Sequence, residues 1–203
     1  MTVQLVSDQK IAETSSKGNQ EKWQDGGIWY KLDQFGYEAL AEVFTAQLLE
    51  CRNIATDFHF TFVRYRMERL LVHGWERTGC SSPNFLKAGE SIITLAHLFQ
   101  QYTGKPLSET LSRMTSDKKR MAYLAEEAAS ITGLSLFPQY LTLLFEIDGL
   151  VLNDERHLNN IAVIARDGGF DYCPIFDQGA GLLSNIMYNP FEIIPKSLIT
   201  QAK

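Results

Sequence analysis

The run of residues 153–181 constrains this chain most, because two polar segments there flank a short apolar hairpin. The first polar segment is Asn153-Asp154-Glu155-Arg156-His157-Leu158-Asn159-Asn160, and the second is Phe176-Asp177-Gln178-Gly179. Between them, the apolar residues 161–164 and the Gly168-Gly169 pair are typical of two strands joined by a tight turn. We therefore expect the two polar segments to converge from the strands of a hairpin.

The order of groups in this run is that of a phosphotransferase site. In such a site one carboxylate orients or deprotonates the acceptor hydroxyl, while an Asn and a second carboxylate hold Mg²⁺ on the nucleotide phosphates. Mg²⁺ takes hard oxygen ligands, which a carboxamide and a carboxylate supply. Glu155 or Asp154 is the candidate acid, and Asn160 and Asp177 are the candidate metal ligands. The alternative interpretation is a polar loop, a hairpin and a buried Asp.

Residues 1–34 are expected to form β structure with turns. A polar loop at 14–20 precedes a hairpin turn at Asp25-Gly26-Gly27 and an aromatic-rich strand at 28–32. Loop N–H groups can face phosphate oxygens, and Lys31, projecting from the strand, can neutralise charge on them. The alternative is a solvated loop followed by a surface lysine.

The first clear helix is expected at 36–52, where apolar residues recur at three-four spacing. Glu38 and Glu42 lie four residues apart on one flank of this helix, close in sequence to Lys31. Either carboxylate can make the ion pair that directs the lysine at the phosphates. The alternative is a solvated acidic face.

The rest of the chain divides into a β-rich part and a helical part. A strand is expected at 58–67, and another over 70–72 and 78–86 that runs into a connector. Pro83 and Gly89 place the boundary at 80–90. From Ser91 the pattern becomes helical. The last helix, at 134–152, is mostly apolar all round and is therefore expected to be central and buried. The other helices are expected from 93 to the Gly104-Lys105-Pro106 stop, at 107–114, and at 116–132, with Ser116 as N-cap and Gly133 as terminator.

Composition excludes several classes of protein. A net charge of −5 and a pI near 5.4 argue against a surface that coats nucleic acid, with a local basic groove as the alternative, and we expect no direct nucleic-acid partner. The three cysteines, Cys51, Cys80 and Cys173, include no CxxC pair, so neither a disulfide framework nor a zinc site is expected. The chain begins without a signal-like segment and contains no run of 18 apolar residues, so we expect a cytoplasmic protein without a membrane anchor.

Taken together, these blocks resemble the HipA-like branch of the protein-kinase-like fold, which comprises bacterial serine/threonine kinases often found in toxin–antitoxin pairs. Residues 18–22 look like the phosphate-loop motif of the family, and Lys31 followed by 37–42 looks like its strand lysine and first helix. Residues 156–160 look like part of its Asp-Arg-His-x-x-Asn catalytic loop, and 176–179 contain its Asp-x-Gly.

The resemblance implies an α+β, two-lobed protein-kinase-like fold, with a β-rich N-lobe at 1–85 and a mainly helical C-lobe at 86–203 that carries a catalytic β-hairpin. It implies an ATP- and Mg²⁺-dependent kinase that phosphorylates a protein and has an antitoxin or another protein as partner. The nucleotide-site roles fall on Gly18, Lys22, Lys31 and Glu38, and the metal roles on Asn160 and Asp177. It further implies autophosphorylation at a phosphate-loop serine, either Ser15 or Ser16.

The sequence departs from the family pattern at the catalytic acid. Glu155 stands where the family has Asp, and its longer side chain can displace the carboxylate by roughly an ångström, which can cost about a hundredfold in rate. Asp154 with Asn159 offers the same acid-plus-five spacing, although Asn160 directly adjoins the 161–164 strand, which favours the Glu155/Asn160 register. A weak or dead pseudokinase and a small-molecule or lipid kinase are therefore alternatives. The chain also ends soon after Gly181, before the further C-terminal helices of the family, as expected of a fragment or a reduced form.

Overall fold

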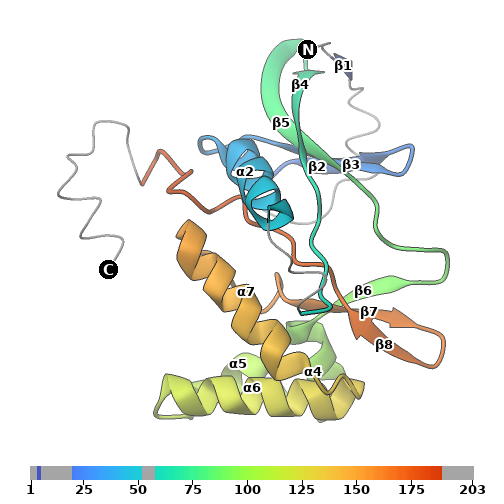
Figure 1. The fold of residues 1–203 in the computed structure, drawn as a ribbon, viewed down its shortest axis with the longest axis vertical. Coiled ribbons are helices and arrows are strands. Elements are labelled where there is room, and N and C mark those ends of the chain that lie inside the picture. The colour runs from blue at the N-terminus through green and yellow to red at the C-terminus, as the bar shows by residue number, and fades with distance from the viewer. Residues whose placement is uncertain (1–3, 6–19, 52–57, 189–203) are drawn as a thin grey trace.

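A computed structural model describes residues 4–5, 20–51 and 58–188. Figure 1 shows a β-sheet with one helix beside it in the upper part and a group of helices in the lower part, with a smaller sheet between them. This arrangement confirms the predicted α+β fold, with a β-rich first part and a mainly helical second part.

The larger sheet contains five strands in the order β1-β4-β5-β3-β2. They are β1 (Gln4–Leu5), β2 (Lys22–Asp25), β3 (Ile28–Leu32), β4 (Arg66–Val72) and β5 (Trp75–Pro83). Only β1 pairs in parallel, with β4, and the other pairs are antiparallel. The predicted hairpin turn between β2 and β3 is confirmed, and Gly26 and Gly27 both have the positive φ that a tight two-residue turn requires.

Helix α2 (Glu38–Glu50) packs against this sheet and is the predicted first helix. Its residues Ala39 and Val43 form a small buried cluster with Cys80 of β5. Cys80 and Cys173 are buried and Cys51 is exposed, and none of the three forms a disulfide. Cys80 is therefore a small buried residue of this cluster.

A smaller sheet of order β6-β7-β8 connects the two parts of the chain. Its strands are β6 (Ser91–Thr94), β7 (Ala162–Arg166) and β8 (Gly169–Tyr172). The hairpin predicted after residue 160 is confirmed as β7 and β8. The expectation that the helical pattern begins at Ser91 is wrong, because residues 91–94 pair with β7 and only then does the chain become helical.

The helical part contains α4 (Leu95–Thr103), α5 (Leu107–Ser112), α6 (Asp117–Thr132) and α7 (Phe137–Val151). The predicted caps of α6 are confirmed: the Ser116 side chain accepts a hydrogen bond from the Lys119 N–H, and Gly133 ends the helix at φ 74°. As predicted, α7 is central, and most of its apolar residues are buried.

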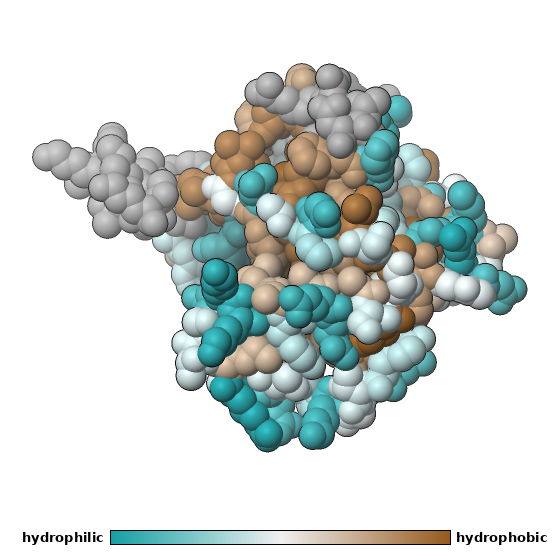
Figure 2. Space-filling model, turned by 60° about the horizontal axis from the view of Figure 1, so that its bottom comes forward, coloured by the Kyte–Doolittle hydropathy of each residue, from teal (hydrophilic) through white to brown (hydrophobic). Residues whose placement is uncertain are grey.

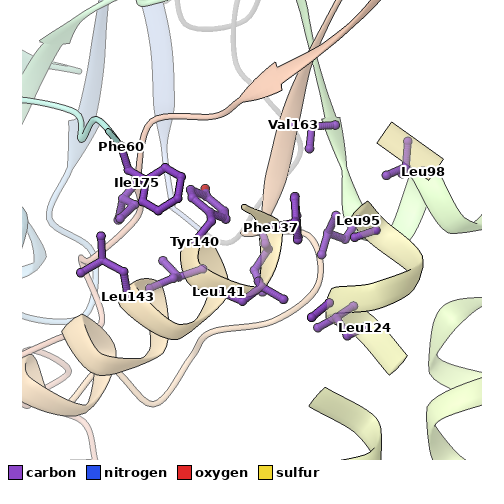
Figure 3. Packing of buried hydrophobic residues seen from close by; sticks show 14 of the residues in the cluster. Phe60, Leu95, Leu98, Leu124, Phe137, Tyr140, Leu141, Leu143, Val163 and Ile175 are labelled. Atoms are coloured by element: carbon purple, nitrogen blue, oxygen red, sulfur yellow. The ribbon is translucent and has the colours of Figure 1, made fainter. Parts of the chain in front are cut away.

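The main hydrophobic core surrounds α7 and also receives a segment from the β-rich part (Figure 3). Phe60 packs edge-on against Tyr140 with ring centroids 5.3 Å apart. Phe62 forms an isolated parallel bridge with Ile175, so the segment before β4 lies beside the residues that follow β8. The strand predicted at 58–67 begins only at Arg66, because the residues before it are used in this packing. The division into 1–85 and 86–203 stays a prediction, and its boundary falls between β5 and β6.

The surface is not uniformly polar. Figure 2 shows one face on which hydrophilic and hydrophobic residues are mixed, with hydrophobic residues gathered mainly in its upper half. The most exposed large apolar side chains among the described residues are Trp75, Leu150, Met187 and Tyr188. No helix in the described ranges is both long and apolar enough to cross a membrane.

Candidate active site

Three segments that are distant in sequence meet at Lys31. This lysine lies on β3, between β2 and β5, directly opposite Lys22 of β2. Its Nζ lies 2.5 Å from Oε1 of Glu42 on α2 and 2.8 Å from Oδ1 of Asp177. The Lys31 side chain is only 12% exposed, so its charge is compensated within the protein rather than by solvent. The aromatic ring of Tyr65 lies 5.3 Å from the same nitrogen, at cation–π distance.

The two candidate carboxylates on α2 have different partners. Glu42 pairs with Lys31, whereas the Glu38 carboxylate accepts hydrogen bonds from the backbone N–H groups of Gln34, Phe35 and Gly36. Glu38 therefore holds the turn that leads into α2. The structure assigns the ion pair with Lys31 to Glu42. The Glu38 side chain contacts this turn and not the lysine, which differs from the nucleotide-site role that the resemblance implies for Glu38.

The charges around Lys31 keep Asp177 ionised. Burial by itself would raise the pKa of the Asp177 carboxyl, but the charge and hydrogen bond of Lys31, with the charges of Lys22 and Arg156, lower it to about 2. Burial lowers the pKa of the Lys22 amine, and the nearby positive charge of Lys31 lowers it further. The site thus combines two cations with a carboxylate that carries its charge throughout the physiological pH range.

This lowered pKa predicts a pH dependence of stability. The ordinary pKa of the group is 3.8, and the folded value is about 2, so ionised Asp177 stabilises the folded state above about pH 4. That contribution is lost as the pH falls toward 2. The variant Asp177→Asn is expected to lose less stability than the wild type between pH 4 and pH 2, as measured by urea unfolding at each pH. Identical pH dependence in the two proteins would contradict the assigned ion pair.

Glu42 also holds the backbone of the Asp-Gln-Gly segment. Its second oxygen accepts a hydrogen bond of 2.8 Å from the N–H of Gln178, the residue after Asp177. Asp177 itself has a positive φ of 66°, a conformation that Asp tolerates better than most residues. One carboxylate of α2 therefore positions both the lysine and the segment that carries the candidate metal ligand.

Arg156 joins the candidate catalytic loop to the same segment. Its guanidinium forms two hydrogen bonds of 2.8 Å with the Asp148 carboxylate of α7, and both side chains are almost fully buried. Its Nη1 also donates to the carbonyl oxygens of Asn160 at 3.1 Å and Phe176 at 3.0 Å. Because Asp177 follows Phe176, this one nitrogen brings the backbones of the two candidate metal ligands, Asn160 and Asp177, close together.

A second buried side chain completes this link. Asn153, 8% exposed, donates from Nδ2 to Oδ1 of Asp148 at 2.9 Å and to Oε1 of Gln178 at 3.1 Å. Sequence reasoning did not assign a role to Asp148, Asn153 or Gln178. The available signal was Asp148 itself, a carboxylate in the mostly apolar helix before the loop, because a buried charge requires a partner.

Removing one partner of the buried pair is expected to destabilise the protein strongly. The variant Asp148→Leu leaves the Arg156 charge buried without its carboxylate, which should lower the free energy of unfolding by about 3–5 kcal/mol. The exposed Arg113–Glu109 pair provides the matched control, and Glu109→Ala should cost less than about 1 kcal/mol. Urea unfolding measures both. Equal effects of the two variants would show that the Asp148–Arg156 pair does not hold the loop.

The two candidate acids lie at the surface of the loop. Asp154, Glu155 and Asn159 are exposed, and Asn160 is half-buried. Their accessibility suits a group that must meet an acceptor from outside, but it is shared by both acids, so the choice between the two registers stays a prediction. Gly18, Ser15 and Ser16 lie outside the described residues.

The chemistry of these groups fits a magnesium nucleotide. Asp177 is an ionised oxygen ligand, Asn160 supplies a second hard donor on the adjoining backbone, and Lys22 and Lys31 supply positive charge for phosphates. No group of three or more His, Cys, Asp or Glu suited to a metal occurs in the part of the chain that the structure describes.

Comparison with known proteins shows the fold. No protein-family model and no curated protein matches the sequence. The Helicobacter pylori proinflammatory kinase CtkA shares 13% identity, with a TM-score of 0.56 over 83% of this chain and 55% of its own. Shewanella oneidensis HipA, solved with HipB and its operator DNA, shares 14% identity, with a TM-score of 0.49 over 82% of this chain and 44% of its own. The chain spans about half the length of these structures.

Proposed function

We propose that this chain, which has the kinase-like fold implied by its resemblance to HipA-like kinases, is an ATP- and Mg²⁺-dependent phosphotransferase. The observation that carries the proposal is the Lys31 ammonium held between Glu42 and Asp177, with Lys22 directly opposite. Burying an ammonium group and its two carboxylate partners costs free energy. Phosphate binding gives this buried lysine a role, because its charge neutralises the phosphate oxygens.

Each residue of the site has a role in this chemistry. Lys31 and Lys22 neutralise phosphate charge, and Glu42 keeps Lys31 in place. Asp177 and Asn160 would hold Mg²⁺, which when bound offsets the negative charge that the phosphates develop during transfer. Glu155, or Asp154 in the other register, orients the acceptor hydroxyl and accepts its proton. Arg156 and Asp148 are positioning residues that fix the loop relative to Asp177.

The proposed acceptor is a serine or threonine of a protein, and the proposed partner is a protein such as an antitoxin. Glu155, one methylene longer than the expected Asp, favours one competing function, a nucleotide-binding pseudokinase that acts by docking its partner. A small-molecule or lipid kinase would use the same groups on a different hydroxyl.

Incubation of the purified chain with labelled ATP, Mg²⁺ and a cell lysate tests the proposal. Transfer of label to a protein, absent with the Asp177→Ala variant, supports a protein kinase. Transfer of label to a small molecule or lipid would show that the acceptor is not a protein. Nucleotide binding without any transfer would establish the pseudokinase.

Autophosphorylation is a separate prediction. A phosphate on Ser15 or Ser16 would add nearly two negative charges to the loop expected to receive ATP phosphates, so it should lower nucleotide affinity. After incubation with Mg·ATP, peptide mass analysis is expected to find one phosphate on the peptide containing these serines. The double variant Ser15→Ala/Ser16→Ala is the control and should gain none. An unmodified wild-type peptide from an active preparation would reject the prediction.

A further inference from the structure

An open pocket of about 480 Å³ lies beside the candidate catalytic loop. It is bounded by α4, by the start of α5 and by the middle of the loop. The polar side chains that line it are His97, Gln100, Ser108, His157 and Asn159, and the apolar ones are Ala96, Pro106, Leu107 and Leu158. Among the lining residues, only Asn159 has a role described above, as the metal ligand in the alternative Asp154/Asn159 register.

Backbone hydrogen bonds fix the wall of the pocket relative to the loop. The N–H of Leu95 donates to the carbonyl oxygen of Ile161 at 2.8 Å, and the N–H of Ala96 donates to that of Leu158 at 3.3 Å. The Thr94 side chain caps α4 by accepting from the N–H of His97. The pocket is therefore built by the same contacts that hold the catalytic loop, and it does not depend on a segment outside the described residues.

The chemistry of the lining favours an anionic guest with an apolar stem. Two imidazoles, two carboxamides and a hydroxyl can all donate hydrogen bonds. No Asp, Glu, Lys or Arg is among the described residues that line the pocket. In a chain with a net charge of −5, a pocket lined with donors and free of carboxylates offers an acidic side chain hydrogen bonds without a like charge in the lining itself. Pro106 and Leu158 offer an apolar surface to the methylene groups of the same guest.

The position of the pocket places its guest near the candidate acid. His157 lies two residues after Glu155, and Asn159 directly precedes Asn160. A side chain in the pocket would therefore belong to a molecule whose hydroxyl can reach the candidate acid. Resting on the proposed function, we propose that the pocket binds an acidic side chain, Glu or Asp, that lies near the phosphorylated serine or threonine in the acceptor protein.

Peptide binding without nucleotide tests this specificity. The probes are heptapeptides with a central serine and one Glu at each flanking position in turn, each matched by the same peptide with Gln. Imidazole NMR signals of the wild-type protein report which of its four histidines the peptide meets. The His97 and His157 signals are expected to move with at least one Glu peptide, and its Gln counterpart should bind about tenfold more weakly, because a carboxylate makes the stronger hydrogen bonds. Equal affinities for Glu and Gln peptides, or unmoved His97 and His157 signals, would overturn the inference.

Two variants of α4 provide a matched comparison. The variant His97→Ala removes a donor from the pocket and is expected to weaken binding of the Glu peptide about tenfold, with little effect on the Gln peptide. The variant Gln101→Ala, an exposed residue of the same helix outside the lining, should leave binding unchanged. Equal binding by wild type and His97→Ala would also overturn the inference.

The failure of this inference is distinguishable from failure of the proposed function. Peptide binding is measured without ATP, and nucleotide binding is measured without peptide. Nucleotide binding and transfer to proteins that show no dependence on acidic flanking residues would reject the pocket assignment alone. Selective binding of the Glu peptide by a chain that transfers no phosphate would retain the pocket and reject the kinase activity.

Discussion

Replacing Asp177 with alanine is expected to lower the rate of Mg²⁺-dependent phosphoryl transfer by about a thousandfold or more. It is also expected to weaken the binding of ATP in the presence of Mg²⁺. The carboxylate is ionised, lies 2.8 Å from the Lys31 ammonium and is positioned by the backbone contact of Gln178 with Glu42. Its removal eliminates the candidate metal ligand and leaves Lys31 with Glu42 as its remaining carboxylate partner. Calorimetry with ATP and Mg²⁺ measures the binding, and transfer of labelled phosphate measures the activity.

Asp171 on β8 provides the control for this experiment. Its carboxylate lies 2.9 Å from Arg166 in a half-exposed pair at the other end of the hairpin. The variant Asp171→Ala removes the same chemical group from the same part of the chain and should leave nucleotide binding and transfer close to wild type. Thermal unfolding of both variants checks that they are folded. Equal binding of Mg·ATP by wild type and Asp177→Ala would reject the assignment of the metal site.

Replacing Glu155 with alanine is expected to abolish transfer while leaving ATP binding unchanged. An acid that acts only on the acceptor hydroxyl contributes to the transition state and not to nucleotide affinity. The variant Glu155→Asp should instead raise the rate, because shortening by one methylene restores the position of the family's carboxylate. A gain of up to about a hundredfold corresponds to correcting a displacement of roughly an ångström. Single-turnover transfer assays measure these rates.

Asp154 is the matched control for Glu155, since the two exposed acids are adjacent on the same loop. In the Glu155/Asn160 register, Asp154→Ala should change the rate little. If Asp154→Ala abolishes transfer and Glu155→Ala does not, the other register is correct and Asn159 replaces Asn160 as the metal ligand. Absence of transfer in every variant and in the wild type, with nucleotide binding retained, would establish the pseudokinase.

Several features were predictable because their causes are local. The N-cap at Ser116 and the terminator at Gly133 act within one helical turn, so adjacent residues specify them. The hairpin of β7 and β8 follows from an apolar strand and a Gly-containing turn, with Gly168 at φ 83°. The apolar helix before the loop was recognisable from composition. The order of these elements with the short motifs between them was enough to predict the kinase-like fold.

Other features depend on contacts between distant residues. Residues 91–94 continue the apolar pattern of the following helix, yet they form β6 because β7 offers them a pairing edge. Phe60 was expected in a strand, but it packs against Tyr140 in the core around α7. In both cases a tertiary contact overrides the local preference, and the partner lies too far along the chain to appear in a sequence window.

The candidate site divides in the same way. The sequence by itself determined the residue types that carry the chemistry, because the Lys31 strand, the Arg156–Asn160 loop and the Asp177 segment are short motifs with recognisable order. Only the tertiary structure decided that Glu42 and not Glu38 meets Lys31, since both lie on one flank of α2 and the packing of that helix on the sheet selects between them. It also decided that Asp148 binds Arg156. A buried guanidinium needs a carboxylate partner, and only the packing of α7 beside the loop places the Asp148 carboxylate next to it.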